Sequence, residues 1–331
     1  MADNIRVIQY GLGPIGSAVA RQVVAREGLE LVGGVDIDPA KIGRDAGQII
    51  GLDRSLGFPV SAKLEQVLER VEADVALHTT SSYFDLFKPQ IIDILEAGLN
   101  VVSTAEELSF PWLAHPDQAA KIDALAKRAG KTVLGTGVNP GFVMDSLPLC
   151  LTAICNQVDR INVTRIINAS LRRGPFQAKI GSGLTVDEFE ARMAAGRMGH
   201  VGLPESMHMV FDTLSKKLAR YQDSVEPVVA EQSIETEFFE VQPGQVRGLK
   251  QMARGYTEEG EFMSLTFLAA LDAGDDGDTI LITGQPNLEV KLKGTNGDIA
   301  TVAITVNAIR RVVEAPPGLV TMRDLPVVTM W

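Results

Sequence analysis

The sequence predicts an α/β protein in which a doubly wound parallel sheet is followed by a second α+β domain with a mixed or antiparallel sheet. Three observations lead to this prediction. Short apolar runs alternate with helical patterns over about the first 140 residues, and a glycine-rich turn follows the first apolar run. After about residue 145, several strand-like runs rich in β-branched and aromatic residues follow one another. The rhythm of the chain therefore changes once, which indicates two domains.

The elements of the first part follow from its apolar runs. The predicted strands are 5–11, 29–36, 73–80, 100–104 and 131–137, and the predicted helices are 14–27, 62–71, 84–98 and 118–130. A glycine ends the helix 84–98, as is common at helix C-termini. Polar or glycine-rich residues follow each strand, where α/β proteins bind their ligands.

The second part is predicted from the same patterns. Its predicted strands are 157–171, 233–242, 244–256, 261–271 and 278–284, and its predicted helices are 185–199 and 204–222. The acidic segment 272–278 resembles a calcium-binding loop but lacks the glutamate at the twelfth position, so we expect a hairpin turn there. We expect the closing helix 297–315 to return to the first domain.

A dinucleotide fingerprint follows the first strand. Gly11, Gly13 and Gly16 have G-x-G-x-x-G spacing, open a helix, and are followed about 20 residues later by Asp36 at a strand end. Gly11 permits a tight turn, Gly13 lets a pyrophosphate approach the backbone, and Gly16 lets the helix pack closely on the strand. We therefore predict a Rossmann-type first domain. The other expected cofactor contacts are Leu12, Pro14, Ile15, Thr79, Thr80, Ser81, Thr104 and Asn139.

The choice of dinucleotide depends on the residues around Asp36. Its carboxylate would accept hydrogen bonds from ribose hydroxyls and repel a 2′-phosphate, which favours NAD. Lys41 and Arg44 follow closely and can each pair with that phosphate, so NADP is the alternative. His78, at the end of a strand, fits a packed interior residue better than a catalyst.

Two segments that leave late strands narrow the reaction. Glu106 and Glu107 follow the strand 100–104, and an Asn-Pro-Gly turn follows the next strand at the domain boundary. Apolar side chains beside that turn and in the second domain are candidates for the walls of a small substrate pocket: Phe142, Val143, Met144 and Phe176. Gln177, together with Arg172, Arg173 and Lys179, either holds a substrate or fixes its own loop.

Four segments resemble a known family. They are STAEELSFPW (103–112), GTGVNPGFVMD (135–145), SLRRGPFQAKIGSGLT (170–185) and VNAIRRVVEAPPGLVTMRDLP (306–326). Together they resemble the relatives of dihydrodipicolinate reductase that include 2,4-diaminopentanoate dehydrogenase and the native amine dehydrogenases. The resemblance covers essentially the whole chain. The histidine pair of the dihydrodipicolinate reductases is missing from the comparable region, which puts reduction of a cyclic dicarboxylate in doubt.

The resemblance implies NAD(P)-dependent interconversion of a small amine with a ketone or aldehyde plus ammonia. A carboxylate near the reacting carbon helps such chemistry, because protons move as ammonia adds and water leaves. The resemblance locates this group in the pair Glu106–Glu107; we prefer Glu107 and keep Glu106 as the alternative. The other hypotheses are a 2,4-diaminopentanoate or related amino-acid dehydrogenase, and a nucleotide-binding protein without catalysis.

Composition excludes several classes of partner. The net charge of −11 and the pI near 5.0 disfavour nucleic acid and acidic membranes, because long-range repulsion opposes both. We find neither a signal peptide nor an apolar run approaching the roughly 20 residues that span a bilayer, and we expect a cytoplasmic protein. Cys150 and Cys155 fit reduced thiols. His200 and His208 fit packing better than metal binding, so we predict no metal site.

We assign residues 1–140, completed by 300–331, to dinucleotide binding. Residues 141–299 are assigned to substrate binding and dimerisation. The strands of this second domain offer a face for a homodimer, since such sheets often pair across a twofold axis.

Overall fold

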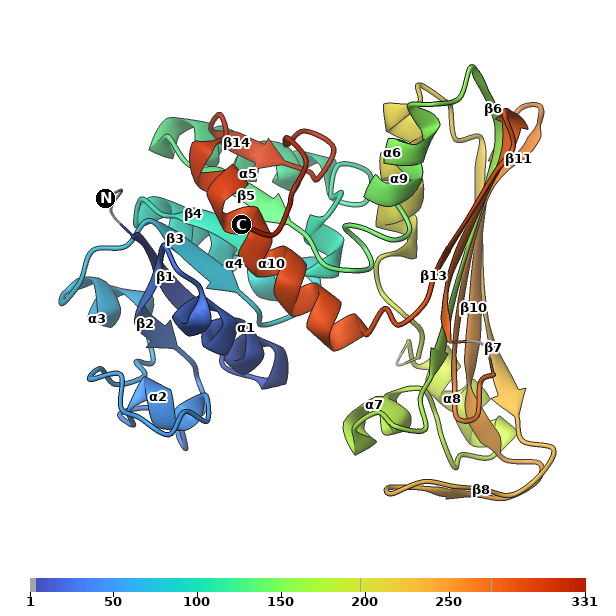
Figure 1. The fold of residues 1–331 in the computed structure, drawn as a ribbon, viewed down its shortest axis with the longest axis horizontal. Coiled ribbons are helices and arrows are strands. Elements are labelled where there is room, and N and C mark those ends of the chain that lie inside the picture. Colours follow the sequence, from blue (N-terminus) through green and yellow to red (C-terminus); the bar gives the residue numbers. More distant parts are fainter. Residues whose placement is uncertain (1–3, 197, 275) are drawn as a thin grey trace. The chain divides into compact units, whose positions relative to one another are not determined.

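The computed structural model describes residues 4–196, 198–274 and 276–331. The chain forms two compact units (Figure 1). The first contains residues 1–142 and 296–331, and the second contains residues 143–295. Two separate stretches of sequence therefore build the first unit, and a single stretch builds the second.

The first unit contains a six-stranded parallel sheet with strand order β14-β5-β4-β3-β1-β2. Its strands are β1 (Ile5–Tyr10), β2 (Leu29–Val35), β3 (Val75–His78), β4 (Asn100–Ser103), β5 (Thr132–Gly135) and β14 (Gly318–Val320). All residues of β3, β4 and β5 are buried, because helices cover both faces of the sheet. This arrangement explains the continuous apolar runs in the sequence and confirms the predicted parallel sheet.

Helices form a separate core on each face of this sheet. Helices α1 (Pro14–Ala25), α2 (Ala46–Ile49) and α10 (Gly297–Glu314) share one core. Helices α3 (Leu64–Leu68), α4 (Phe84–Glu96) and α5 (Pro116–Ala129) share the other. A short 3₁₀ helix, η1 (Glu106–Leu108), follows β4. The first unit is thus doubly wound, with α10 and α1 on the same face of its sheet (Figure 1).

The second unit contains a six-stranded mixed sheet with strand order β13-β12-β6-β11-β10-β7. Its strands are β6 (Gln157–Asn168), β7 (Arg220–Val229), β10 (Val246–Thr257), β11 (Gly260–Ala270), β12 (Gly277–Gln285) and β13 (Leu288–Leu292). Only β6 and β11 run parallel; the other neighbours are antiparallel. Two short strands, β8 (Ile234–Glu235) and β9 (Glu240–Val241), pair separately. The predicted mixed second sheet is confirmed.

The described residues of the second unit form the helices α6 (Ser146–Thr152), α7 (Gly174–Lys179), α8 (Val186–Ala194) and α9 (Leu203–Thr213). Helix α8 begins with a capping box, in which Thr185 and Glu188 bond each other's backbone N–H. Helix α9 packs on β10 so closely that a Cβ at Gly255 would lie 2.6 Å from the Met207 sulfur. Across the described ranges, no helix is long and apolar enough to cross a membrane.

Three predictions for the second unit were wrong. The helix 204–222 ends at Thr213, and β7 begins at Arg220. Strand β7 lies at the sheet edge, where exposed polar residues and Pro227 are tolerated, so its composition did not resemble a strand. The strand 233–242 is two short strands instead. The segment 272–278 is not a hairpin, because β6 lies between β11 and β12; residue 275 lies outside the described residues.

Candidate functional site

The glycine loop between β1 and α1 shows why glycine occupies two of its positions. Gly11 has a φ of 92°, and a Cβ there would lie 2.7 Å from the Thr79 carbonyl oxygen. A Cβ at Gly16 would lie 1.9 Å from the Gly11 carbonyl oxygen. Gly13 differs, since a Cβ there would meet no described atom within 4 Å. Gly11 and Gly16 are required by packing within the protein, whereas Gly13 leaves open space beside the backbone.

The open space lies at the N-terminus of α1. Gly13 is the N-cap residue and Pro14 occupies the first turn, and no side chain of the described residues caps this end. Unpaired N–H groups and the helix dipole together attract anions at such a terminus. An uncapped terminus beside a glycine with free space fits the pyrophosphate of a dinucleotide.

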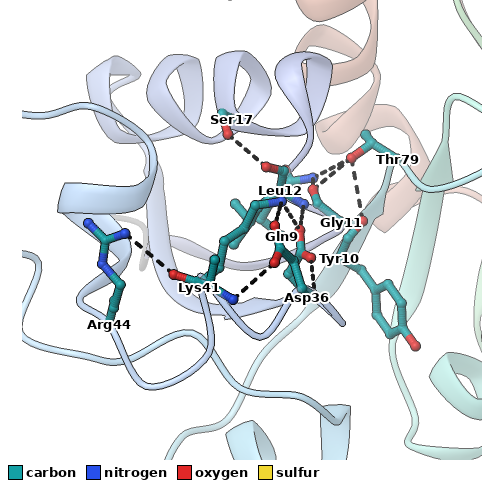
Figure 2. A network of polar contacts seen from close by, with 11 residues as sticks. Gln9, Tyr10, Gly11, Leu12, Ser17, Asp36, Lys41, Arg44 and Thr79 are labelled. Carbon is teal, nitrogen blue, oxygen red and sulfur yellow. Dashed lines mark hydrogen bonds and ion pairs between the residues drawn. The ribbon is translucent and has the colours of Figure 1, made fainter.

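A buried network holds the glycine loop in shape, as Figure 2 shows. The Gln9 side-chain amide donates to the Gly11 carbonyl at 2.9 Å and to the Thr79 hydroxyl at 2.8 Å. The Thr79 hydroxyl in turn donates to the Gly11 carbonyl at 2.9 Å. Thr79, expected at the cofactor, therefore also braces the glycine loop.

Asp36 joins the end of β2 to the same loop (Figure 2). Its carboxylate accepts the Leu12 N–H at 2.8 Å, the Asp38 N–H at 2.9 Å and the Lys41 ammonium at 2.9 Å. Burial alone would raise the pKa of Asp36, but these three donors outweigh it and lower the pKa below its usual value. Asp36 is therefore a charged carboxylate with Lys41 as its counter-ion.

Ile37, directly after Asp36, is the most exposed large apolar residue beside this loop, with 84% of its surface accessible. An isoleucine gains nothing from such exposure. A flat apolar group lying next to Asp36, such as an adenine ring, would cover it. Ile37 was not among the predicted site residues, although an apolar residue inside a polar turn is a visible signal in the sequence.

His78 at the end of β3 is fully buried. Its ring nitrogens contact the Ser103 hydroxyl at 2.9 Å and the Gln90 side-chain oxygen at 2.7 Å. Burial lowers the pKa of His78 to about 4, so the ring is neutral at pH 7. This environment is that of a packed interior histidine, the reading that the sequence favoured over a catalyst.

The other residues expected at the cofactor also lie at the carboxyl ends of the strands. Thr80 bonds Gln90 at 2.6 Å, and the Ser81 hydroxyl accepts the Tyr83 N–H at 3.2 Å. Thr104, just after β4, donates its N–H to the His78 carbonyl at 3.0 Å. These residues therefore stand along the edge of the parallel sheet where such folds bind ligands.

The two adjacent glutamates form η1 at this same edge. The Glu107 N–H donates to the Ser82 carbonyl at 3.3 Å, and the Glu107 carboxylate accepts the Phe84 N–H at 2.5 Å. The carboxylate thereby caps α4, whose own N-cap residue, Tyr83, has no side-chain bond. The His115 imidazole lies 3.7 Å from the same carboxylate oxygen. Glu107 thus connects the segment after β4 to the loop after β3.

The chain around η1 packs directly against the end of β5. A Cβ at Gly135 would lie 2.4 Å from the Leu108 carbonyl carbon, so only glycine permits this contact. The Ser109 hydroxyl donates to the Glu106 carbonyl at 2.8 Å, and Leu108 is fully buried. The two residues that follow the glutamate pair, Leu108 and Ser109, are therefore fixed by packing and a hydrogen bond.

The Asn-Pro-Gly turn ends the first stretch of the first unit. Gly141 has a φ of 120°, and a Cβ there would lie 2.5 Å from the Gly137 nitrogen. Asn139 is buried, whereas Phe142 is 39% exposed. The turn thus presents one apolar ring outside the core.

The remaining expected pocket residues belong to the second unit. Val143 and Met144 are fully buried. The Arg172 guanidinium lies 4.8 Å from the centre of the Phe176 ring. Gln177 is buried; its amide donates to the Ser170 and Arg172 carbonyls, and its oxygen accepts the Thr236 hydroxyl. Gln177 therefore joins its own loop to the β8–β9 hairpin.

Within the described parts of the chain, no group of three or more histidine, cysteine, aspartate or glutamate side chains is arranged to hold a metal ion. His200 stacks on Phe267 with ring centres 4.6 Å apart. Burial lowers the pKa of His208 to about 4. Stacking accounts for His200, and burial accounts for His208, as packing residues.

Two further residues of the first unit, Gln9 and His115, were not predicted from the sequence. Gln9 lies within a predominantly apolar strand, so nothing in the local sequence marked it as a site residue. His115 follows Glu107 by eight positions in a polar connection, and no local pattern marks it. Only the folded chain brings these side chains to the glycine loop and to the Glu107 carboxylate.

Comparison with family models matches both parts of the chain. Residues 5–103 match the model described as the N-terminus of dihydrodipicolinate reductase. Residues 142–331 match the model described as the C-terminal domain of 2,4-diaminopentanoate dehydrogenase.

Similar proteins match over nearly the whole length. The 2,4-diaminopentanoate dehydrogenase of Acetoanaerobium sticklandii is 33% identical, over 98% of this chain and 94% of its own. The structure of an amine dehydrogenase from Mycobacterium smegmatis is 27% identical with a TM-score of 0.88, and the match covers 100% of this chain and 98% of that one. The WlbA dehydrogenase from Bordetella pertussis, solved with NADH and UDP-GlcNAcA, has 16% identity and a TM-score of 0.51 over 88% of this chain and 75% of its own, and shows a shared fold.

Proposed function

Since the chain belongs to the 2,4-diaminopentanoate dehydrogenase and amine dehydrogenase family, and is thus an oxidoreductase acting on CH–NH₂ donors, we propose that it interconverts a small amine with a ketone or aldehyde plus ammonia. The resemblance drawn from the four sequence segments is confirmed. The observation that carries the finer proposal is the Glu107 carboxylate, which lies against the loop after β3 at the ligand-binding edge of the sheet.

The first unit fits a nicotinamide dinucleotide. The α1 N-terminus and the space beside Gly13 suit the pyrophosphate, Asp36 suits the adenosine ribose, and Ile37 suits the adenine. When bound, the cofactor accepts or supplies the hydride. NADH in the complex of the WlbA dehydrogenase supports the same choice here. We favour NAD because the charged Asp36 would repel the 2′-phosphate of NADP. We keep NADP as the alternative because Lys41, which lies beside Asp36, could pair with that phosphate.

Thr80, Ser81, Thr104 and Asn139 remain the other proposed cofactor contacts. Phe142, Val143, Met144, Phe176 and Gln177 remain the proposed substrate side. Phe142 is the partly exposed apolar ring among them, which supports its contact with a small apolar amine. Gln177 supports the site by holding its loop in place.

Glu107 is the proposed acid–base group, with Glu106 as the alternative. During deamination, hydride leaves the amine carbon, and water adds to the resulting iminium ion. The carboxylate takes a proton from this water and later gives a proton to the nitrogen, which departs as ammonia. A carboxylate also stabilises the positive charge of the iminium ion. The fixed position of Glu107 supports this role, since orientation lowers the barrier.

The test pairs activity with stability. Purified protein, NADH or NADPH, ammonia and a panel of small ketones and aldehydes would be assayed for cofactor oxidation, beside the variants Glu107→Gln and Glu106→Gln. We expect turnover by the parent and a loss of about 100-fold or more in one variant, with the melting temperature preserved because glutamine still accepts the Phe84 N–H. The proposal fails if no carbonyl reacts and both variants behave like the parent.

A second candidate is 2,4-diaminopentanoate dehydrogenation itself, favoured by the 33% identity to the Acetoanaerobium sticklandii enzyme. Activity on 2,4-diaminopentanoate without activity on simple amines would decide for it. Tight dinucleotide binding without turnover of any amine or carbonyl would instead indicate a nucleotide-binding protein without catalysis.

We also propose a homodimer through the second sheet. One hollow of about 450 Å³ on this sheet is lined by Gln222, Asp223, Ser224, Glu226, Lys250, Met252 and Arg254. Charges of both signs on a single face can pair with their symmetry copies across a twofold axis. Sedimentation of the purified chain at twice the monomer mass would support the dimer.

A further inference from the structure

His115 has two contacts that together fix its ring. The imidazole stacks on Phe84, with ring centres 4.3 Å apart and an angle of 22° between the planes. Its Nε2 atom lies 3.7 Å from the Glu107 Oε2 atom. Phe84 is buried, whereas the His115 and Glu107 side chains are each about a quarter exposed, at 26% and 22%. One face of the ring thus packs on the core, and one edge points to the carboxylate.

The backbone at His115 is fixed as well. Its N–H donates to the Pro111 carbonyl at 2.9 Å, and its carbonyl accepts the Ala119 N–H at 2.8 Å as α5 begins. His115 occupies the N-cap position of α5 but makes no cap bond with its side chain. The helix makes no bond to the imidazole. Of the contacts described here, the one that involves the polar edge of the ring is the contact with Glu107.

The same carboxylate oxygen of Glu107 accepts the Phe84 N–H. Glu107 therefore meets two polar groups, a backbone donor at the start of α4 and an imidazole edge 3.7 Å away at the start of α5. Other charged residues lie near the starts of α4 and α5. Lys88 donates a hydrogen bond to Gln118, and Asp85 and Asp117 lie in the first turns of α4 and α5. The imidazole edge is thus the second polar group beside the Glu107 carboxylate.

We infer that His115 is a positioning residue for the reaction, one whose Nε2 edge attracts the Glu107 carboxylate from 3.7 Å away while Phe84 fixes the plane of the ring. The inference rests on the proposed acid–base role of Glu107. A polar N–H edge at ion-pair distance attracts a carboxylate, so removing that edge leaves Glu107 with the Phe84 N–H as the remaining one of these two contacts. Turnover then falls, because a mobile carboxylate spends less time aligned with the reacting atoms.

Two variants separate the donor from the ring. His115→Phe keeps an aromatic ring for stacking on Phe84 and removes the donor. His115→Gln keeps a donor and removes the ring. We expect kcat of His115→Phe to fall about threefold or more, the size expected for the loss of a partly exposed ion-pair contact, with the KM for the cofactor and the melting temperature close to the parent. His115→Gln is expected to retain more of kcat than His115→Phe.

A third variant adds a rescue. His115→Ala leaves a flat slot between Phe84 and Glu107, so added imidazole is expected to restore part of its kcat without changing its melting temperature. Parental kcat in His115→Phe, or no recovery of His115→Ala with imidazole, would overturn the inference.

The Glu107→Gln variant shows which idea has failed. If Glu107→Gln is inactive while His115→Phe has the parental rate, the acid–base proposal stands and the inference about His115 is wrong. If Glu107→Gln is as active as the parent, Glu107 is only the cap of α4, and both the assignment and the inference fall.

Discussion

At the scale of single residues, the glycines of one loop serve two purposes. Gly11 and Gly16 are required by the fold, because a side chain at either position would overlap the backbone of a neighbouring segment. Gly13 has a φ of −68°, which any residue can adopt, and open space at its Cβ position. Neither the backbone conformation nor the packing of the protein requires glycine at this position, so we infer that a ligand requires it.

Alanine substitutions separate these purposes. Gly16→Ala is expected to lower the free energy of unfolding of the first unit by about 1–3 kcal/mol or more, because Cβ would overlap the Gly11 carbonyl. Gly13→Ala is expected to change that free energy by less than about 0.5 kcal/mol while weakening NAD binding about tenfold. Urea unfolding and fluorescence titration with NADH measure the two effects. Equal NAD affinity in Gly13→Ala and the parent would show that no phosphate lies there.

At the scale of elements, a buried ion pair joins neighbouring strands of the second sheet. Arg165 of β6 lies opposite Asp278 of β12, with its guanidinium 3.1 Å from the carboxylate. Both side chains are almost fully buried, and Arg165 also donates to the Thr295 carbonyl at 3.3 Å. Burial raises the pKa of Asp278 even though Arg165 opposes the shift. Neither charge is well placed without the other.

Breaking this pair has a predictable cost. Arg165→Met leaves Asp278 buried without its partner and is expected to lower the free energy of unfolding of the second unit by about 3–5 kcal/mol. The double variant Arg165→Met with Asp278→Leu is expected to recover most of that loss, because no charge remains buried. Denaturant unfolding of the parent, the single and the double variants tests both. A single variant as stable as the parent would contradict the argument.

At the scale of the whole molecule, each unit contains a histidine that is neutral in the folded protein. Burial lowers the pKa of both His78 and His208 to about 4. An unfolded histidine takes up a proton near pH 6.5. Between these values the unfolded chain binds more protons than the folded chain, so the free energy of unfolding falls as the pH falls.

The pH dependence of stability follows from this difference. The contribution of His78 is complete above about pH 6.5 and is lost on acidification towards pH 4, by about 3 kcal/mol at most. His78→Asn is expected to flatten the stability profile of the first unit in this window, whatever its stability at pH 7. Urea unfolding at a series of pH values from 4 to 8 provides the measurement, with His208→Asn as the matched variant for the second unit. Parallel profiles for His78→Asn and the parent would contradict the assignment.

Much of the architecture was predictable, because it depends on short-range patterns. Apolar runs between polar turns predicted the parallel strands, and the glycine spacing predicted the loop before α1. The edge strand β7 was missed, because an edge strand buries little and can be as polar as a helix surface. The acid–base role of the pair Glu106–Glu107 was assigned through the family resemblance, since two adjacent carboxylates after a strand do not by themselves distinguish a surface from a site.

The sequence by itself determined the parallel sheet, the glycine loop and the acid at the end of β2, since each depends on residues close together in the chain. Only the tertiary structure decided the environments of Glu107 and Asp36. Glu107 meets the Phe84 N–H across 23 positions and also lies beside His115. Asp36 reaches the Leu12 N–H across 24 positions. Such contacts depend on which strands become neighbours, and strand order is set by the packing of the whole core, which no local pattern records.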